Sequence, residues 1–547
     1  MRVVIVGGVA GGMSAATRLR RLSEETEIVV LERSGYVSYA NCGLPYYVGG
    51  VIDDEADLLL QTPDSLHQRF HLDVRVNSEV VALDTPSRTV RVRRVGDESE
   101  YSLTYDVLIL SPGATPVIPP LPGIERAMPL RTVEDVERMV ERLSDQPASV
   151  AVIGGGFIGL EIAENLAHRG LRVTVIEALD QVLAPLDPEM AGAVVDEMER
   201  HGVGVRLGSS VVGVGPSSVS LASGDEVPGE MVVVAIGVRP DVTLARTAGL
   251  EIGPRGGIWV NEVNQTSDPA IYALGDAAEK RDALDGSSSL VPLANVANRH
   301  GRVVADHIMG REIRQTPTIG TAIVKVFDLT IAATGWNEKR LRAAGRPFST
   351  VHSHPSHHAG YYPGAESMML KLLFDPTSGQ ILGAQGVGYQ GVDKRIDVLA
   401  TALYAHLRAP ELADLELAYA PPFGSAKDPV NMLGYMAENV LEGPCRPIQW
   451  YEVAEWLEAG AVLVDVRTPA EFADGAIPGA LNIPLDDLRQ RADELKGRRV
   501  VVTCRVGQRG HTGTMLLLDR GIDAVNLDGG YLTWRTSPVG RSLHPVS

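Results

Sequence analysis

The stretch that decides the fold spans residues 150–177, with the sequence VAVIGGGFIGLEIAENLAHRGLRVTVIE. An apolar run of strand length leads into a glycine-rich turn, an amphipathic helix follows, and a second apolar run ends in Glu177. This order predicts a βαβ unit that binds a dinucleotide at its turn. Gly154 permits the tight turn, Gly156 lets the backbone approach a pyrophosphate, and Gly159 allows close packing of helix against strand.

A second copy of the pattern lies in residues 2–32, RVVIVGGVAGGMSAATRLRRLSEETEIVVLE. The outer glycine positions are filled by Gly7 and Gly12. Val9 stands at the middle position, so we expect Gly8 and Gly11 to supply the close approach instead. Two copies in the full strand, turn, helix and strand order are a much stronger signal than one glycine motif alone.

Each unit ends in an acid, Glu32 in the first copy and Glu177 in the second. A carboxylate about 20 residues beyond the turn accepts hydrogen bonds from a ribose diol. It would also repel a 2′-phosphate, which favours NADH over NADPH for the second unit. NADPH stays possible, because loop residues can relax this preference.

Two further segments, residues 108–116 (LILSPGATP) and 271–279 (IYALGDAAE), are strands that end in glycine turns. Together with the inserted second βαβ unit, they resemble the returning flavin-domain segments of the two-dinucleotide disulfide reductases. This resemblance implies that Gly113 lies at the FAD site and that Asp276 bonds the flavin ribityl chain.

The predicted fold class is α/β, with two Rossmann-like dinucleotide-binding domains of the glutathione-reductase kind, an α+β dimerisation domain and a C-terminal α/β domain. Strand-like runs at residues 322–327 and 368–374 and a helical run at 395–406 mark the third domain. The expected boundaries are 1–117 with 248–318 for FAD, 118–247 for NAD(H), 319–443 for dimerisation, 444–449 for a linker and 450–547 for the last domain.

Composition narrows the class of protein. The 547 residues carry a net charge of −19, which disfavours binding to nucleic acid through a basic face. Three cysteines argue against a disulfide-stapled secreted scaffold. No apolar run approaches the roughly 20 residues of a membrane span, and no signal peptide is visible, so we expect a cytoplasmic protein.

Cys42 lies in SYANCGLPYYVGG, residues 38–50, directly after the first βαβ unit. Its asparagine, glycine and proline neighbours do not form a periodic apolar face, which disfavours a buried structural cysteine. The next cysteine along the chain is Cys445. A lone thiol beside a flavin can form a mixed disulfide with an external thiol or cycle through sulfenic acid.

The residues around Cys42, together with segments 358–364 (HAGYYPG) and 418–435 (AYAPPFGSAKDPVNMLGY), resemble coenzyme A disulfide reductase and related single-cysteine flavoproteins. The resemblance covers about residues 1–440. It implies a homodimer in which two tyrosines of one subunit approach the redox cysteine of the other. The matching positions are Tyr361 and Tyr419, and dimer packing is the simpler alternative for both.

Coenzyme A carries phosphates, so basic residues are needed near Cys42. Arg18 and Arg21 lie one helical turn apart and suit this role. The resemblance adds the coenzyme A residues Ser38, Asn41 and Arg299. It also adds Arg33 and Asn41 to the FAD site.

Cys504 begins CRVGQRG, residues 504–510, between a strand and an apolar helix. Backbone N–H groups of such a turn lower a thiol pKa and bind anions, and Arg505 and Arg509 add positive charge. With DVRTPAEF (465–472) and LDGGYLTW (527–534), this loop resembles single-domain rhodaneses. A Cys-x5-Arg loop also serves phosphatases, but these flanks favour sulfur transfer.

The combined hypothesis is a flavoprotein that uses FAD and NADH to reduce coenzyme A disulfide, coenzyme A persulfide or polysulfide at Cys42, while Cys504 handles sulfane sulfur. Its partners would be small thiol and sulfane-sulfur molecules. The alternatives are an NADH oxidase or peroxidase with a Cys42 sulfenic acid, and a non-catalytic flavin redox sensor. Cys445 is expected to be incidental, and the histidine-rich run 352–358 is expected to be a solvated loop without a metal.

Overall fold

The computed structural model describes residues 1–314 and 317–543, which form two compact units. The first unit holds residues 1–178 and 209–318, and the second holds residues 179–208 and 319–547 apart from the four C-terminal residues left undescribed. Residues 179–208 therefore group with the C-terminal part of the chain, although they follow the second βαβ unit in sequence. No helix in the described ranges is long and apolar enough to cross a membrane.

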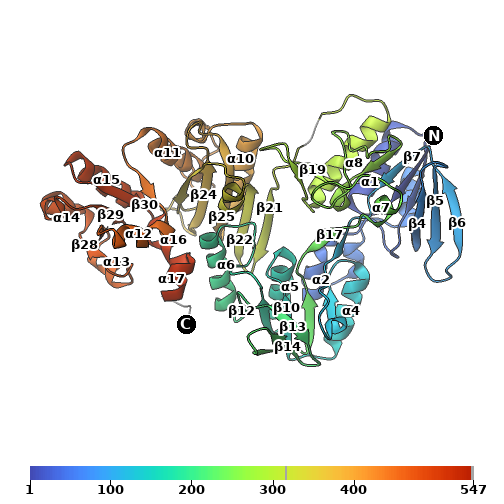
Figure 1. Ribbon diagram of the computed structural model, residues 1–547, viewed down its shortest axis with the longest axis horizontal. Coiled ribbons are helices and arrows are strands. Elements are labelled where there is room, and N and C mark those ends of the chain that lie inside the picture. Colours follow the sequence, from blue (N-terminus) through green and yellow to red (C-terminus); the bar gives the residue numbers. More distant parts are fainter. Residues whose placement is uncertain (315–316, 544–547) are drawn as a thin grey trace. The chain divides into compact units, whose positions relative to one another are not determined.

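The N-terminal βαβ unit builds a parallel sheet in the order β18-β7-β1-β2-β3, blue to green in Figure 1. Its strands are β1 (Arg2–Val6), β2 (Glu27–Leu31), β3 (Asp73–Arg75), β7 (Val107–Leu110) and β18 (Ile271–Ala273). Helices α1 (Ala10–Leu22) and α8 (Ala294–Ile308) pack against each other. The strand and helix predicted for this segment are confirmed, and β7 and β18 place residues 108–116 and 271–279 side by side.

The second βαβ unit builds a parallel sheet in which β11, β10, β16 and β9 are neighbours. Their bounds are Arg172–Ile176, Ser149–Ile153, Met231–Val234 and Ala127–Pro129. Helix α5 (Phe157–His168) follows the glycine turn, and α4 (Val133–Ser144) precedes β10. All residues of β10 are buried, as expected for a parallel sheet covered on both faces.

Smaller elements complete the first unit. Antiparallel ribbons are formed by β4 (Ser78–Asp84), β5 (Thr89–Arg94) and β6 (Glu100–Thr104), by β13 (Val211–Val214), β14 (Ser218–Leu221) and β15 (Glu226–Pro228), and by β8 (Ala114–Pro116) with β17 (Val238–Pro240). The last pair joins the two segments where the chain leaves and re-enters the first dinucleotide-binding fold.

The second unit contains an antiparallel sheet in the order β21-β22-β25-β24-β23. Its strands are β21 (Ala322–Val326), β22 (Leu329–Gly335), β23 (Ser349–Ser353), β24 (Met368–Phe374) and β25 (Ile381–Gly388). Its helices are α6 (Pro188–Arg200), α9 (Glu338–Ala343), α10 (Val392–Tyr404) and α11 (Pro429–Glu442). The predicted α+β segment is therefore present, with α10 at the position of the expected helix.

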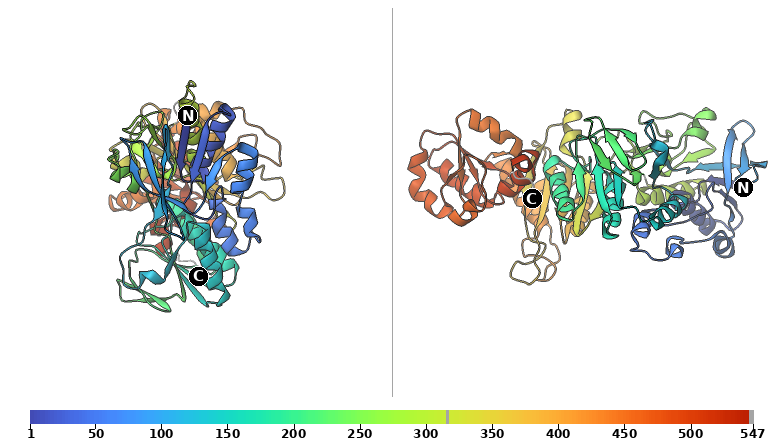
Figure 2. Two further views of the ribbon diagram at one scale, coloured as in Figure 1. Left: turned by 90° about the vertical axis from the view of Figure 1, so that its right-hand side faces the viewer. Right: turned by 90° about the horizontal axis from the view of Figure 1, so that it is seen from below.

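The C-terminal segment forms a parallel sheet in the order β26-β30-β29-β27-β28, drawn in orange to red with helices around it in Figure 2. The strands are β26 (Pro447–Ile448), β27 (Val462–Asp465), β28 (Leu481–Asn482), β29 (Val500–Thr503) and β30 (Ala524–Leu527). The helices are α12 (Val453–Glu458), α13 (Pro469–Ala473), α14 (Leu485–Arg491), α15 (Gln508–Asp519), α16 (Gly530–Thr536) and α17 (Pro538–Leu543).

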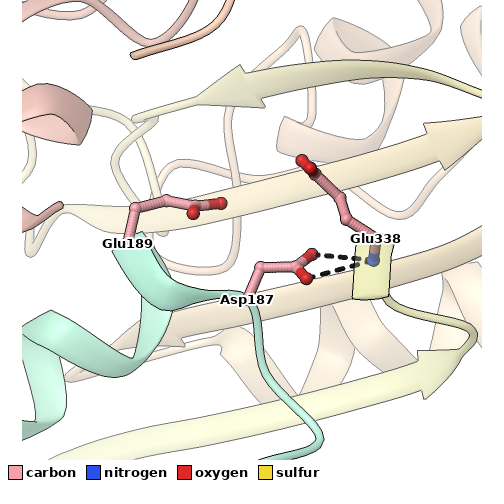
Figure 3. Close-up of side chains that lie close together, drawn as sticks. All are labelled: Asp187, Glu189 and Glu338. Atoms are coloured by element: carbon pink, nitrogen blue, oxygen red, sulfur yellow. Dashed lines mark hydrogen bonds between the residues drawn. The ribbon is translucent and has the colours of Figure 1, made fainter. Parts of the chain in front are cut away.

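A buried charge cluster ties the second unit together. Three carboxylates at the N-terminal ends of α6 and α9 face one another in Figure 3: Asp187, Glu189 and Glu338. The Nζ atom of Lys371, on β24, lies 2.9, 2.5 and 2.7 Å from their oxygens. Burial alone would lower the pKa of Lys371, but the three carboxylates raise it well above its ordinary value. A lysine ammonium thus supplies the cation that this acidic cluster requires.

The expectation of a solvated loop at residues 352–358 is wrong for its two ends. His352 is fully buried, because β23 extends through Ser353 and pairs with β24, and His358 is buried as well. The ring nitrogens of His352 contact Asp528 and Glu189, which come from the C-terminal segment and from α6. Neither carboxylate is near His352 in sequence, so the pattern of the run could not show them.

Cys445, expected to be incidental, is buried beside the linker strand β26. Burial raises its pKa to about 11. The incidental role expected for Cys445 stays a prediction.

Replacing Lys371 by methionine should destabilise the second unit strongly. The substitution leaves three carboxylates buried without their cation, and breaking a buried ion pair typically costs about 3–5 kcal/mol. The free energy of unfolding, followed by tryptophan fluorescence in denaturant, should fall by this order. Lys325→Met is the matched control, because Lys325 is exposed on β21 and pairs with exposed Asp328 at 3.7 Å. It should cost less than about 1 kcal/mol, and equal losses in the two variants would contradict the role given to Lys371.

Candidate functional site

The outer glycines of both dinucleotide turns are required by the fold itself. Gly7 and Gly154 have φ of +99° and +110°, in the left-handed region that favours glycine. A Cβ on Gly12 would lie 2.0 Å from the carbonyl oxygen of Gly7. A Cβ on Gly159 would lie equally close to the carbonyl oxygen of Gly154. These contacts give the tight turn and the close helix packing that the sequence predicts.

The middle positions of the two turns differ. Gly156 precedes α5, and a Cβ built there meets no atom within 4 Å, so the protein itself does not need a glycine. Open space at a helix N-terminus fits a phosphate group that approaches the backbone. In the first turn, a Cβ on Gly11 would lie 2.3 Å from Cδ1 of Leu274. Gly11 is therefore needed for packing, and its expected approach to a cofactor stays a prediction.

The two acids reach back to their own glycine turns. Glu32 Oε2 accepts a hydrogen bond from the N–H of Gly8 at 2.7 Å, and Glu177 Oε2 accepts one from Gly155 at 2.7 Å. Burial raises the pKa of Glu32, although its hydrogen bonds to backbone N–H groups act in the opposite direction. From the sequence alone, each acid is expected only to bind a ribose diol. The structure adds that each one also fixes the shape of its turn.

Cys42 lies in a 3-10 turn, Asn41–Gly43, that leads into the short helix α2 (Leu44–Gly49). Its side chain is exposed to solvent. The pKa of the Cys42 thiol is nevertheless raised, first by partial desolvation and then by the negative charge of Glu161, while the guanidinium of Arg131 lowers it. The fold therefore keeps this thiol accessible without making it a strong acid.

Glu161 lies on α5, which packs against α2, and its Oε1 is 3.4 Å from the hydroxyl of Tyr46. Burial raises the pKa of Glu161 to about 7. The sequence alone does not point to Glu161, because this residue belongs to the second βαβ unit and lies 119 positions beyond Cys42. The only signal available was its place in the first turns of the second dinucleotide helix.

Arg131 is a second residue that the sequence analysis missed. Its Nη2 lies 2.8 Å from Oδ2 of Asp276. The Asn41 amide, with its nitrogen turned toward the Arg131 carbonyl at 3.0 Å, accepts a bond from Nη1 at 3.1 Å. A Cβ on Gly113, whose φ is +76°, would also approach this guanidinium. Arg131 thus brings Asn41, Gly113 and Asp276 of the predicted FAD site together.

The basic residues predicted for a phosphate-bearing substrate have different surroundings. Arg18 is bound to Asp306, with 2.6 Å between Nη2 and Oδ1. Arg21 is exposed and lies over the ring of Phe70, and Arg299 is exposed on α8. Ser38 has a φ of +48° and its N–H donates to the carbonyl of Gly8. Arg33 pairs with Asp241 at 3.5 Å.

Tyr361 and Tyr419 come together in the second unit. Their hydroxyl oxygens are 3.1 Å apart, and the side chains are 77% and 47% exposed. Phe423, four residues beyond Tyr419, is 71% exposed. Such a group of exposed aromatic side chains is typical of a surface that another molecule covers.

The predicted sulfur-transfer loop is fully formed. Cys504 directly follows β29 and is buried, and α15 begins within the loop at Gln508. Arg509 pairs with Glu471 through two contacts of 2.6 and 2.8 Å. Arg509 holds the pKa of Glu471 down at about 2, and the pKa of Arg509 is raised chiefly by Glu471 and further by the thiol of Cys504. The loop therefore carries a fixed cation at its thiol.

The DVR flank of this loop is a structural element. Arg467 forms a buried ion pair with Asp465, with 2.7 Å between Nη2 and Oδ2, and stacks on the ring of Tyr531. Thr468 caps α13 in a box with Glu471. The flank thus aligns Glu471, which in turn orients Arg509.

Comparison with known proteins agrees with this geometry. The family description "pyridine nucleotide-disulphide oxidoreductase" matches residues 1–301, its dimerisation domain matches 321–429, and a rhodanese-like domain matches 449–537. A coenzyme A disulfide reductase of Staphylococcus aureus is 34% identical over 441 residues, which cover 80% of this chain and 100% of the relative. The chain belongs to the pyridine nucleotide-disulphide oxidoreductases.

Solved structures extend the likeness over both units of this oxidoreductase. Reduced Bacillus anthracis CoADR-RHD is 47% identical with a TM-score of 0.96, and the match covers 98% of each chain. An NAD-dependent persulfide reductase from A. fulgidus is 38% identical with a TM-score of 0.92, covering 98% of this chain and 100% of that one. The water-forming NADH oxidase from Lactobacillus brevis is 25% identical, with a TM-score of 0.77 over 81% of this chain and 99% of that one.

These findings confirm the predicted fold class and the C-terminal rhodanese domain. The oxidoreductase uses FAD and a nicotinamide dinucleotide. Its two glycine turns fit these groups, since each lies at the N-terminus of a long helix, and the open space at Gly156 has the place that a pyrophosphate needs.

Replacing Gly156 by alanine should weaken the binding of NADH without disturbing the fold. The new methyl group meets no protein atom, but it occupies the space through which a pyrophosphate approaches the N-terminus of α5. We expect the KM for NADH to rise about tenfold, equal to about 1.4 kcal/mol, in steady-state assays. Gly159→Ala is the contrasting variant and should lower the melting temperature, because its Cβ collides with the backbone. An unchanged KM for NADH in Gly156→Ala would contradict this assignment.

Replacing Glu161 by glutamine should make the Cys42 thiol more acidic. The carboxylate raises the pKa of Cys42, so its removal should move the pH profile of Cys42 alkylation to lower pH. Because the pKa of Glu161 is about 7, its charge grows as the pH rises through neutrality, and the variant should lose this pH dependence. The alkylation rate of the dithiothreitol-reduced enzyme with iodoacetamide gives the measurement. Glu141→Gln, exposed on α4, is the control; equal profiles for the two variants would disprove the influence of Glu161.

Proposed function

We propose that the chain is an FAD-dependent reductase that uses NADH to reduce coenzyme A persulfide, polysulfide and coenzyme A disulfide. One observation carries the proposal. The chain places an accessible thiol without a neighbouring cysteine, Cys42, after its first dinucleotide unit, and a second thiol, Cys504, in a loop with a fixed arginine. A lone reductase thiol needs an external thiol to complete a disulfide.

The names of similar proteins support this choice of substrates. The Staphylococcus aureus relative is a coenzyme A disulfide reductase, and the A. fulgidus structure is an NAD-dependent persulfide reductase. The two structures that match the whole chain are more similar to it in sequence than the water-forming NADH oxidase, which matches only 81% of the chain. Plain disulfide reduction does not require a rhodanese domain, whereas release of sulfide from a persulfide can use one.

At Cys42 the proposed chemistry is thiol–disulfide exchange. The Cys42 thiolate attacks the coenzyme A sulfur of a persulfide, a Cys42–coenzyme A disulfide forms, and hydrosulfide leaves. FAD, when bound, passes two electrons from NADH to this disulfide. Cleavage regenerates the Cys42 thiolate and releases coenzyme A, so that NADH, H⁺ and the persulfide give NAD⁺, coenzyme A and H₂S. Glu161, with a pKa of about 7, is suited to hold a proton near this exchange.

At Cys504 the proposed chemistry is sulfur transfer. The thiolate takes the sulfane sulfur of a donor such as thiosulfate and releases sulfite, and a coenzyme A thiol then takes this sulfur as a persulfide. Arg505 and Arg509 supply positive charge for the anionic donor. The long pantetheine arm of coenzyme A would carry the sulfur from Cys504 to Cys42.

We further propose a homodimer. The dimerisation domain is present, and exposed Tyr361, Tyr419 and Phe423 offer an aromatic surface to a second copy. In the dimer, Tyr361 and Tyr419 would approach Cys42 of the partner subunit, and their hydroxyls would donate to the departing thiolate. Exposed Arg21 and Arg299 would bind phosphates of coenzyme A, with Arg18, Ser38 and Asn41 completing that site.

The first test is mass spectrometry of the purified enzyme before any reducing agent is added. We expect a coenzyme A adduct on Cys42 that dithiothreitol removes, because a lone thiol can complete a disulfide only with an external thiol. Sulfenic acid at Cys42, with NADH consumption driven by dioxygen alone, would instead favour an oxidase. Binding of flavin without any turnover would favour a redox sensor.

The second test separates the two thiols. Cys42→Ser should abolish NADH-dependent reduction of coenzyme A disulfide but keep sulfur transfer from thiosulfate to cyanide. Cys504→Ser should show the reverse pattern. Cys504→Ser should also lose NADH oxidation driven by thiosulfate plus coenzyme A. If this variant used polysulfide and the thiosulfate mixture as fast as the wild type, the shuttle between the two sites would be refuted.

A further inference from the structure

His352 joins two domains through a pair of buried carboxylates. It lies on β23 and has no exposed surface. Its Nδ1 is 2.6 Å from Oδ2 of Asp528, and its Nε2 is 3.0 Å from Oε1 of Glu189. Both ring nitrogens face acceptors, so the imidazole is held as a cation that donates on both sides. Burial alone would lower the pKa of His352, but Asp528 and Glu189 raise it to about 9.

The carboxylate of Asp528, which directly follows β30, accepts three hydrogen bonds. Besides Nδ1, the backbone N–H of His352 donates to Oδ1 at 3.1 Å, and Nε2 of Gln449 donates to Oδ2 at 3.2 Å. Asp528 has only 2% of its surface exposed. Its carboxylate is therefore fixed chiefly by the strand that carries His352.

Asp528 is followed directly by a double-glycine turn that lies against the Cys504 loop. Gly529 and Gly530 both have left-handed φ, +65° and +60°. A Cβ on Gly530 would lie 2.4 Å from the carbonyl oxygen of Cys504, and a Cβ on Gly529 would lie 2.8 Å from Cβ of His352. The turn thus fills the space between the histidine and the loop.

Hydrogen bonds continue from this turn into the loop. The N–H of Tyr531 donates to the carbonyl of Cys504 at 2.8 Å, and the N–H of Leu532 donates to that of Arg505 at 3.0 Å. A second contact comes from the same strand end, where Nε2 of His354 lies 2.7 Å from Oγ1 of Thr533. A shift of Asp528 would therefore move the carbonyl groups that set the loop conformation.

We propose that His352 of the dimerisation domain is a positioning residue for the sulfur-transfer loop of the rhodanese domain, acting through Asp528 and the Gly529–Gly530 turn. The inference rests on the proposed sulfur transfer at Cys504. In this proposal the contact with Asp528 positions the sulfur-transfer loop, whereas the contact with Glu189 joins His352 to the Lys371 cluster.

Two isosteric substitutions separate these contacts. In His352→Asn the side-chain amide nitrogen takes the place of Nδ1 and keeps the bond to Asp528. In His352→Gln it takes the place of Nε2 and keeps the bond to Glu189. Both variants remove the same positive charge from the same buried site, so each is the matched control of the other.

The experiment measures thiosulfate:cyanide sulfur transfer by the full-length holoenzyme. His352→Gln should lower kcat/KM about tenfold or more, since small misplacements of reacting groups have effects of this size, and His352→Asn should stay within about threefold of wild type. In the glutamine variant the loss should appear in kcat, with the KM for thiosulfate little changed. Coenzyme A disulfide reduction should remain unchanged in both, which shows that the chain is folded.

Equal sulfur-transfer losses in the two variants, or no loss in either, would overturn the inference. So would a parallel loss of coenzyme A disulfide reduction. If His352→Gln does not fold, Asp528→Asn decides the question, because it removes the charge from the other partner and should impair sulfur transfer alone. A wild-type enzyme without any Cys504-dependent sulfur transfer would instead refute the proposed function on which the inference rests.

Discussion

The second unit depends on a lysine ammonium without contact to water. Lys371 has no exposed surface and is held by three carboxylates at the N-terminal ends of α6 and α9. A buried charge is tolerated only when its partners are close and well oriented. The partners of Lys371 lie on segments far apart in sequence, so this requirement fixes how α6 and α9 pack on the sheet. Glu189 then extends the network to His352 and through it to the rhodanese domain.

The parts of the fold that were predicted from sequence are those set by local geometry. Gly7 and Gly154 need a left-handed φ, and Gly12 and Gly159 need the absence of a Cβ, so their spacing alone reveals the turn. The Cys504 loop is equally local, since its strand, loop and helix are continuous in the chain. For that reason the sequence of the loop and its flanks predicts the rhodanese domain correctly.

The parts that escaped prediction depend on contacts between distant segments. Arg131 joins Asn41 to Asp276, and Glu161 acts on Cys42 across α2 and α5. No spacing rule connects such positions. The histidine run was misjudged for the same reason, because the carboxylates that bury and charge His352 come from either side of it in sequence, Glu189 and Asp528.

The bridge at His352 also bears on whether the rhodanese domain is an independent module. Asp528 in the rhodanese domain and Glu189 in α6 are both buried carboxylates that share one histidine of a third segment. Removing the rhodanese domain would take away Asp528, which lies closer to His352 than Glu189 does, and would open the buried surface on which His352 lies. The rhodanese domain and the sheet that carries His352 therefore share one buried charge network and are not independent modules.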